Sequence, residues 1–131
     1  MEEFPGPKEG SIFYEDEKVY ACLAFEPVVD GHTVAAVKRN DIDDIGKLPK
    51  EERSHLLRLV FEAVRPALIE CYQIEKVYVV YIDETRHPHF HLYPSEKGGE
   101  QGFGLMTRRY KELTDFSMIP RLRSYTAKAM E

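Results

Sequence analysis

The sequence predicts an α+β domain in which one long helix covers a five-stranded, mostly antiparallel sheet, in the order β, β, β, α, β, β. Three observations support this fold class. Short runs rich in β-branched and aromatic residues lie on both sides of one stretch with helical periodicity. Only residues 83–86 separate the last two runs, too few for a parallel crossover. A length of 131 residues with 43% hydrophobic content suits a single domain with its own core.

The N-terminal third is predicted to hold an arm and three strands. Residues 1–10 contain two prolines and two glycines, which predicts a flexible arm ahead of a single domain over residues 11–131. Residues 12–14 and 19–25 are the predicted strands of a hairpin, because a charged turn joins two apolar and aromatic runs. Residues 32–38 follow as a third strand, with β-branched residues at alternate places.

A long helix is predicted to begin at Pro49, where two glutamates follow close to the positive end of the helix dipole. Apolar residues recur at intervals of three and four over residues 56–68, which should bury one stripe against the sheet. Within this helix, His55 is expected to be a solvated surface residue. Pro66 lacks a backbone donor, so we expect a kink or an early end near Arg65.

The remaining strands are predicted on both sides of a short connection. Residues 76–82 are rich in valine and tyrosine, and the histidine-rich segment at residues 87–93 should pair with them in antiparallel fashion. Residues 95–104 contain four glycines and are predicted to form a flexible loop. Beyond Leu105 the pattern mixes helical and irregular signals.

Charge and composition argue against two classes of partner. A formal net charge of -5 and a pI near 5.6 argue against a broad grip on duplex nucleic acid, which needs clustered Lys and Arg. The longest apolar runs fall far short of the ~18 residues that span a bilayer, and no basic, apolar leader is recognised, so we expect a cytoplasmic protein without membrane contact. Cys22 and Cys71 lie in apolar stretches and are expected to be buried free thiols.

Three of the five histidines, His87, His89 and His91, occupy alternate positions in one segment. If this segment is extended, their side chains project from one face as a row with a spacing of roughly 6.6–6.8 Å. Imidazole suits nucleophilic attack, proton transfer or metal ligation near neutral pH, because its ordinary pKa is about 6.5. The row is therefore the main candidate for a functional site.

Three interpretations of the row compete. It could be a surface strand that carries histidines in phase by chance. It could ligate a metal, with His32, Glu26 or Asp83 completing the set. No second cluster with ligand spacing occurs, so no metal is predicted. In the third interpretation, the middle imidazole attacks phosphorus while its neighbours orient it and stabilise charge.

A resemblance favours the third interpretation. Residues 87–93, with the sequence HPHFHLY, resemble the signature of the histidine triad (HIT) superfamily of nucleotide-binding proteins: three alternating histidines with apolar residues between and after them. Upstream, residues 19–25 and 27–34 resemble that family's strand, proline-containing turn and Gly-His strand. The likeness covers about residues 11–94 in the family's order. It implies a HIT-like fold and a homodimer in which helices and sheet edges of two copies meet.

The resemblance also implies an activity. The protein would be a hydrolase or nucleotidyl transferase acting at the α-phosphate of a nucleoside phosphoramidate or dinucleoside polyphosphate, with no metal or other cofactor in the chemical step. His89 would be the nucleophile and form a covalent nucleotidyl-histidine, its ring oriented by a backbone carbonyl near the first histidine. His87 would buttress the row, and His91 would reach phosphate or leaving-group oxygens. His32 corresponds to the family's fourth histidine, expected beside the first.

The chain departs from the family pattern at several positions. Glu26 is the side chain left to bind the ribose hydroxyls. The connection before the triad is shortened to residues 83–86, in which Thr85 and Arg86 are the candidate phosphate contacts. Residues 39–41, Arg-Asn-Asp, stand where the family usually has a histidine. Two alternatives therefore stay open: a nucleotide-binding protein with little turnover, and a metal-binding protein that uses the row.

Overall fold

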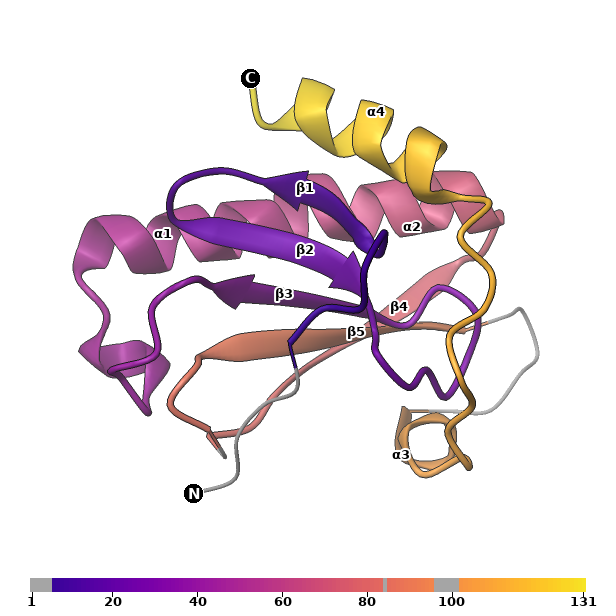
Figure 1. Cartoon of the computed structure of the whole chain (residues 1–131), viewed down its shortest axis with the longest axis horizontal. Coiled ribbons are helices and arrows are strands. Elements are labelled where there is room, and N and C mark those ends of the chain that lie inside the picture. Colours follow the sequence, from indigo (N-terminus) through magenta and orange to yellow (C-terminus); the bar gives the residue numbers. More distant parts are fainter. Residues whose placement is uncertain (1–5, 84, 96–101) are drawn as a thin grey trace.

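A computed structural model gives the structure of residues 6–83, 85–95 and 102–131, which form one sheet with helices packed on it (Figure 1). The strand order is β1-β2-β3-β5-β4, and every neighbouring pair is antiparallel. The predicted α+β fold with a five-stranded sheet is therefore confirmed. The strands are β1 (Ile12–Glu15), β2 (Val19–Leu23), β3 (Thr33–Val37), β4 (Lys76–Tyr81) and β5 (His89–Ser95).

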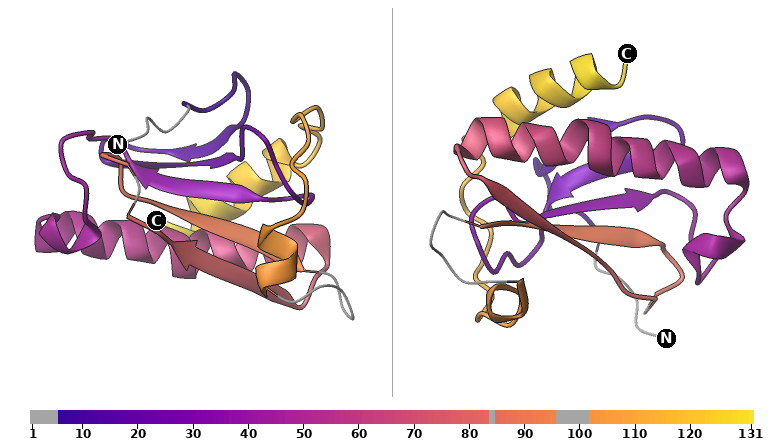
Figure 2. Two further views of the ribbon diagram at one scale, coloured as in Figure 1. Left: turned by 90° about the horizontal axis from the view of Figure 1, so that it is seen from below. Right: turned by 180° about the vertical axis from the view of Figure 1, so that it is seen from behind.

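One long helix lies along one face of the sheet in three consecutive segments, which Figure 2 shows as a single run: α1 (Lys50–Arg58), η2 (Leu59–Val64) and α2 (Arg65–Tyr72). Of the two alternatives expected near Arg65, a kink or an early end, the early end was wrong, because the helix continues to Tyr72. The middle segment is π-helical, and the Arg65 N–H bonds to the Val60 carbonyl five residues back. This wide turn lies directly before Pro66, which has no N–H and whose ring would press on the carbonyl four residues earlier in a regular α-helix. The helix thereby accommodates the proline and continues.

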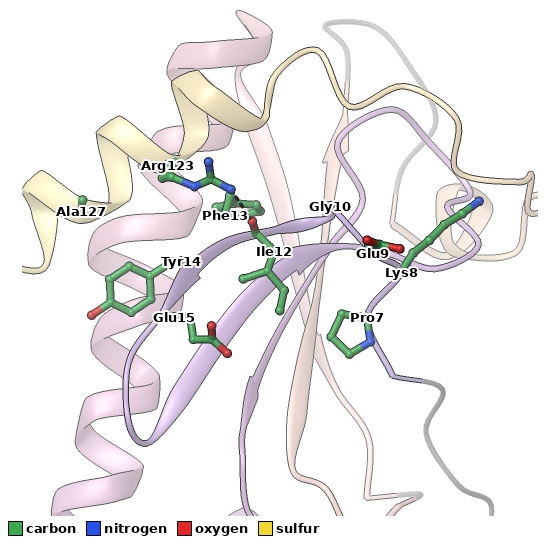
Figure 3. A pocket seen from close by; sticks show the side chains of 10 residues that line it. All are labelled: Pro7, Lys8, Glu9, Gly10, Ile12, Phe13, Tyr14, Glu15, Arg123 and Ala127. Atoms are coloured by element: carbon green, nitrogen blue, oxygen red, sulfur yellow. Dashed lines mark hydrogen bonds between the residues drawn. The ribbon is translucent and has the colours of Figure 1, made fainter.

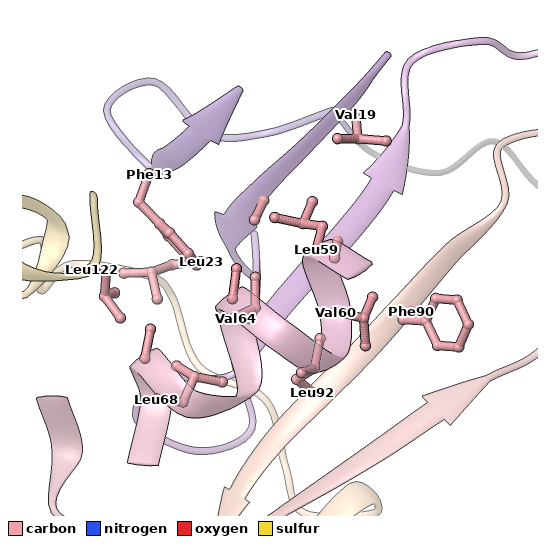
Figure 4. Packing of buried hydrophobic residues seen from close by; sticks show 14 of the residues in the cluster. Phe13, Val19, Leu23, Leu59, Val60, Val64, Leu68, Phe90, Leu92 and Leu122 are labelled. Atoms are coloured by element: carbon pink, nitrogen blue, oxygen red, sulfur yellow. The ribbon is translucent and has the colours of Figure 1, made fainter. Parts of the chain in front are cut away.

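The long helix buries its apolar stripe against the sheet, as the periodicity predicts (Figure 4). Leu59, Val64 and Leu68 are fully buried and share one cluster with Phe90 and Leu92 of β5. Burying each such side chain contributes roughly 1.5–3 kcal/mol. The helix-covered face of the sheet is therefore the main core, and the opposite face carries the alternate residues of each strand.

The C-terminal region forms a helix that the mixed sequence signals did not predict. This helix, α4 (Ile119–Ala129), packs on β1 and on the long helix, with Leu122 fully buried (Figures 1 and 4). Arg123 donates a hydrogen bond to the carbonyl of Ile12, so α4 covers the outer edge of the sheet at β1. Two short segments complete the described structure: η1 (Ile45–Lys47) and α3 (Gly102–Met106).

The predicted glycine-rich loop over residues 95–104 falls only partly within the described structure. Ser95 belongs to β5, and Gly102 begins α3, so both ends of the predicted loop are in regular elements. The rest of that prediction, at residues 96–101, lies outside the described residues, as do residues 1–5 of the predicted arm.

The cysteines are free and buried, as the sequence predicts for Cys22 and Cys71. In the described part of the chain, no helix combines the length and apolar character that crossing a bilayer requires.

Candidate active site

Strand β5 places two of the three histidines of the row on the sheet face away from the long helix. His89 and His91 lie opposite Ala36 and Val34 of β3, with their ring centroids 5.1 Å apart. The residue between them, Phe90, points into the helix-covered core. The predicted alternation thus holds from His89 onward, whereas His87 lies in the bend just before the strand begins.

The ring of His89 is oriented by the main chain. Its Nδ1 lies 2.8 Å from the backbone carbonyl oxygen of His87. A carbonyl oxygen can only accept, so Nδ1 carries the proton, and in the neutral ring Nε2 holds the lone pair. This is the orienting carbonyl that the family resemblance implies. Only 8% of His89 is exposed, which limits the positions its ring can take.

Thr85 also holds the backbone of His87 in place. Its hydroxyl donates to the His87 carbonyl oxygen at 3.0 Å and accepts from the His87 N–H at 3.1 Å. The sequence interpretation assigned Thr85 to the nucleotide. In the structure its hydroxyl is engaged with the backbone of His87, so its described role is to fix the bend that precedes β5.

His32 packs beside the third histidine of the row and not beside the first, so that expectation was wrong. Its Nε2 lies 2.9 Å from Nδ1 of His91, and its ring stacks on Tyr93 at a centroid distance of 4.3 Å. The antiparallel register explains the difference: Thr33 pairs with Leu92, so the residue before β3 meets the far end of the histidine segment.

Hydrogen bonds assign the tautomers of this pair. The backbone N–H of Val28 donates to Nδ1 of His32 at 3.2 Å, so Nε2 of His32 carries the proton and donates to Nδ1 of His91. Nε2 of His91 then carries a proton and is a donor. The turn is held from behind at Gly31, where φ is +83° and an added Cβ would lie 3.0 Å from atoms of both Pro94 and Tyr72.

Burial keeps these imidazoles neutral. It lowers the pKa of His32 to about 3, with a further contribution from His91. Burial likewise lowers the pKa of His91 to about 4, helped by His89, and the same two causes, burial first, lower the pKa of His87. Near neutral pH these three rings therefore act as neutral hydrogen-bonding groups and not as cations.

Two tyrosines beside the row were not singled out by the sequence interpretation. Tyr93 stacks on His32 and on His91. The hydroxyl of Tyr20, on β2, lies 3.4 Å from Nε2 of His87. Strand alternation was the available signal, because it places both tyrosines on the sheet face that carries the histidines.

The network described above joins His87, His89, His91, His32 and Thr85. Glu26, in the β2–β3 connection, and Arg86, in the bend before β5, are both exposed and stand outside that network. The described residues contain no group of three or more His, Cys, Asp or Glu side chains arranged to hold a metal ion.

Two cavities lie near the β2–β3 connection and near β1. One of about 410 Å³ is bounded by the β2–β3 connection and residues 111–118, with His32 and Tyr72 in its wall. A larger one, about 760 Å³, lies between the N-terminal segment, β1 and α4, and Figure 3 shows that Tyr14 and Arg123 line it. None of its lining residues belongs to the histidine network.

Comparison with known proteins identifies the family. The sequence model of the HIT domain matches residues 6–98, which is most of the chain. The chain belongs to the HIT family. No curated protein matches this HIT chain in sequence.

Solved structures share the HIT fold at low identity. A Hit-like protein of Bartonella henselae involved in cell-cycle regulation is 20% identical with a TM-score of 0.70, over 88% of this chain and 86% of that one. A hypothetical histidine triad nucleotide-binding protein of Sulfolobus tokodaii is 19% identical with a TM-score of 0.60, over 92% and 83%. The C. elegans NitFhit protein is 19% identical with a TM-score of 0.67, and the match covers 97% of this chain but 31% of NitFhit. At these identities the likeness establishes the fold alone.

Proposed function

We propose that this HIT protein is a nucleotide hydrolase or nucleotidyl transferase that attacks the α-phosphate of a nucleoside phosphoramidate or dinucleoside polyphosphate through His89. The observation that carries the proposal is the 2.8 Å contact between Nδ1 of His89 and the His87 carbonyl. It fixes the tautomer in which Nε2 has the lone pair needed for attack on phosphorus. The nucleotide-binding description of the Sulfolobus tokodaii protein supports a nucleotide as the ligand.

The proposed reaction has two displacement steps. In the first, the Nε2 lone pair of His89 forms a bond to phosphorus, and the bond from phosphorus to the amine nitrogen or phosphate oxygen breaks. The leaving group departs with that electron pair and takes any proton it needs from solvent. In the second, water attacks the nucleotidyl-histidine, the N–P bond breaks, and the electron pair returns to His89 as water gives up a proton to solvent.

The neighbouring groups would act by position and charge. Nε2–H of His91, whose tautomer is set through His32, would donate to a non-bridging phosphate oxygen, where charge concentrates in phosphoryl transfer. Arg86 would approach the phosphates from the exposed bend before β5, and Glu26 would accept from the ribose hydroxyls. Thr85 would contribute through the peptide of His87.

The experiment uses adenosine phosphoramidate and diadenosine polyphosphates as substrates for the wild-type protein and for His89→Ala. Wild-type turnover with loss of at least about a thousandfold in His89→Ala supports covalent catalysis, and a mass increase of one nucleotidyl group on quenched wild-type protein identifies the intermediate. Loss of less than about tenfold, only ~1.4 kcal/mol in the barrier, contradicts it. His55→Ala is the control, because His55 bonds to Asp16, outside the histidine network.

A nucleotide-binding protein with little turnover is the second candidate. The electrostatics of the connection between β4 and β5 favour it: desolvation and then the charges of Asp44 and Asp43 raise the pKa of Asp83, which indicates a negative environment at one end of that connection. Negative charge there would oppose the further negative charge that develops on the leaving group during reaction, and so slow turnover. Calorimetry that shows adenosine monophosphate binding to a protein without turnover of either substrate would select this candidate.

We also propose that two copies associate as a homodimer through helices and sheet edges, and that the protein is cytoplasmic. Strand β4 forms one edge of the sheet, and Ile82, directly after it, is half exposed. On the long helix, Phe61 is also about half exposed. Sedimentation equilibrium tests the dimer, and a single species at the monomer mass would reject it.

A further inference from the structure

Tyr20 reaches the histidine row from two strands away. On β2 it pairs with Ala36 of β3, and Ala36 pairs with His89 of β5, so the three residues form one line across the sheet. Residues in one such line project from the same face. Ala36, fully buried, is the smallest side chain that can stand between them, and it leaves room for an aromatic ring to extend toward the start of β5.

The end of that ring contacts the first histidine. The Tyr20 hydroxyl oxygen lies 3.4 Å from Nε2 of His87, at the long end of the hydrogen-bond range, with ring centroids 6.1 Å apart. Burial, and then the neighbouring Cys22, raise the pKa of Tyr20, so the phenol stays protonated and can donate. Burial lowers the pKa of His87, whose neutral ring can accept at Nε2.

His87 is the residue on which the orientation of the nucleophile depends. Its carbonyl oxygen accepts from Nδ1 of His89, and Thr85 bonds to both the carbonyl and the N–H of the same residue. Thr85 therefore restrains the backbone of His87, while Tyr20 contacts its side chain. Together the two contacts limit rotation of the bend that presents the orienting carbonyl.

We propose that Tyr20 is a positioning residue for the nucleotidyl transfer: its hydroxyl donates to Nε2 of His87 and so holds the peptide that orients His89. This inference rests on the proposed function. Tyr20 has no direct role toward phosphorus, so it should affect kcat and leave substrate binding nearly unchanged. Loss of its hydroxyl also removes a hydrogen bond to the neutral form of His87, which makes protonation of that ring easier.

The test is Tyr20→Phe, which keeps the ring and removes the hydroxyl. Turnover of adenosine phosphoramidate is measured from pH 5 to 9. We expect kcat to fall about tenfold with KM within about twofold, as for loss of one orienting hydrogen bond. The acid limb of the kcat profile should move to higher pH, because His87 is protonated at higher pH in the variant. A His87 cation beside the nucleophile would oppose its attack. Thr85→Val should lower kcat in the same way.

Tyr14→Phe is the matched control. Tyr14 is also a strand tyrosine; it is partly buried, and its hydroxyl donates to Asp16, away from the row. It should lose a hydrogen bond at least as strong as that of Tyr20, with kcat and the pH profile unchanged. An active wild-type protein whose kcat and pH profile are the same in Tyr20→Phe overturns the inference, as does an equal fall in Tyr14→Phe.

A second measurement separates this inference from the proposed function. Ring nitrogen NMR reports the tautomer and the titration of His87 whether or not the protein turns over substrate. In Tyr20→Phe, His87 should titrate at higher pH than in the wild type. A titration that does not move overturns the contact itself, whereas an inactive wild type with a shifted titration overturns the proposed function and leaves the contact established.

Discussion

The two faces of strand β5 make different contacts, although their residues alternate along the seven positions of one strand. On the helix-covered face, Phe90 and Leu92 belong to the main core. On the other face, His89 and His91 hold polar contacts of 2.8 and 2.9 Å that assign ring tautomers. Because side chains alternate with period two, the core contacts and the proposed chemistry belong to adjacent residues. A register slip by one residue would exchange them and destroy both.

Leu92→Ala should produce the largest change on the core face. Leu92 is fully buried, and truncating such a leucine costs about 2–5 kcal/mol through lost transfer energy and the cavity left behind. Urea unfolding measures the loss, and kcat of the remaining folded protein should stay near the wild-type value. A loss below about 1 kcal/mol would show that the core relaxes around the site.

His91→Ala, one residue earlier, should have the opposite signature. Removing one donor to a developing phosphate charge lowers kcat about a hundredfold, close to 2.7 kcal/mol in the barrier. The free energy of unfolding should change less than in Leu92→Ala. Steady-state kinetics and urea unfolding on the same pair of variants test this. Equal effects of the two variants on both quantities would abolish the distinction between the faces.

Acidification should lower the free energy of unfolding through the histidine face. The change per pH unit should be smaller than the effect of either substitution. Folding lowers the pKa of His32 to about 3 from 6.5, so the unfolded chain binds the proton first and stability falls as pH drops below about 6.5. His91, with a pKa of about 4, adds to the loss. The slope is about 1.4 kcal/mol per pH unit for each proton taken up. Urea unfolding at pH 7, 6 and 5 should show it, and His32→Gln should reduce the slope.

Asp16 titrates below the range of pH 5 to 7, so it does not contribute to the change in stability measured there. Burial alone would raise its pKa, but hydrogen bonds from His55 and from two backbone N–H groups outweigh it and lower the pKa to about 2. Its contribution is present above pH 3.8 and is lost only as pH falls through about 2. A stability that stays flat between pH 7 and 5 would contradict the assigned role of burial at His32 and His91.

Local patterns predicted most of the fold, because they depend on near neighbours. Alternation and β-branched content located the strands, and the apolar stripe located the long helix. Of the kink or early end expected near Arg65, the early end was wrong, because a π turn is a cooperative adjustment of several residues that no single position predicts. The helix α4 was missed because its burial depends on β1, more than 100 residues earlier in the chain.

The candidate site likewise has features that the sequence predicted and features that it did not. The row itself follows from spacing, and the orienting carbonyl of His87 follows from the resemblance to the family. The partner of His32 depends on strand register, and the contacts of Thr85 depend on the geometry of one bend. His55, expected to be solvated, instead bonds to Asp16 of the β1–β2 turn at 2.6 Å. Such pairings join distant segments, and spacing along the chain carries no information about them.

The absence of a side chain at Gly31 affects the hydrogen bonds of the histidine face of the sheet. A single hydrogen in place of a side chain at this Cα lets the turn rest against Tyr72 and Pro94 with a positive φ. His32 follows directly, and Val28 points its N–H back at that ring. A bulkier residue here would push the turn outward. His91 would then lose its hydrogen bond from His32, which determines which of its ring nitrogens carries the proton. Gly31 thus helps to set which nitrogens of His32 and His91 carry protons.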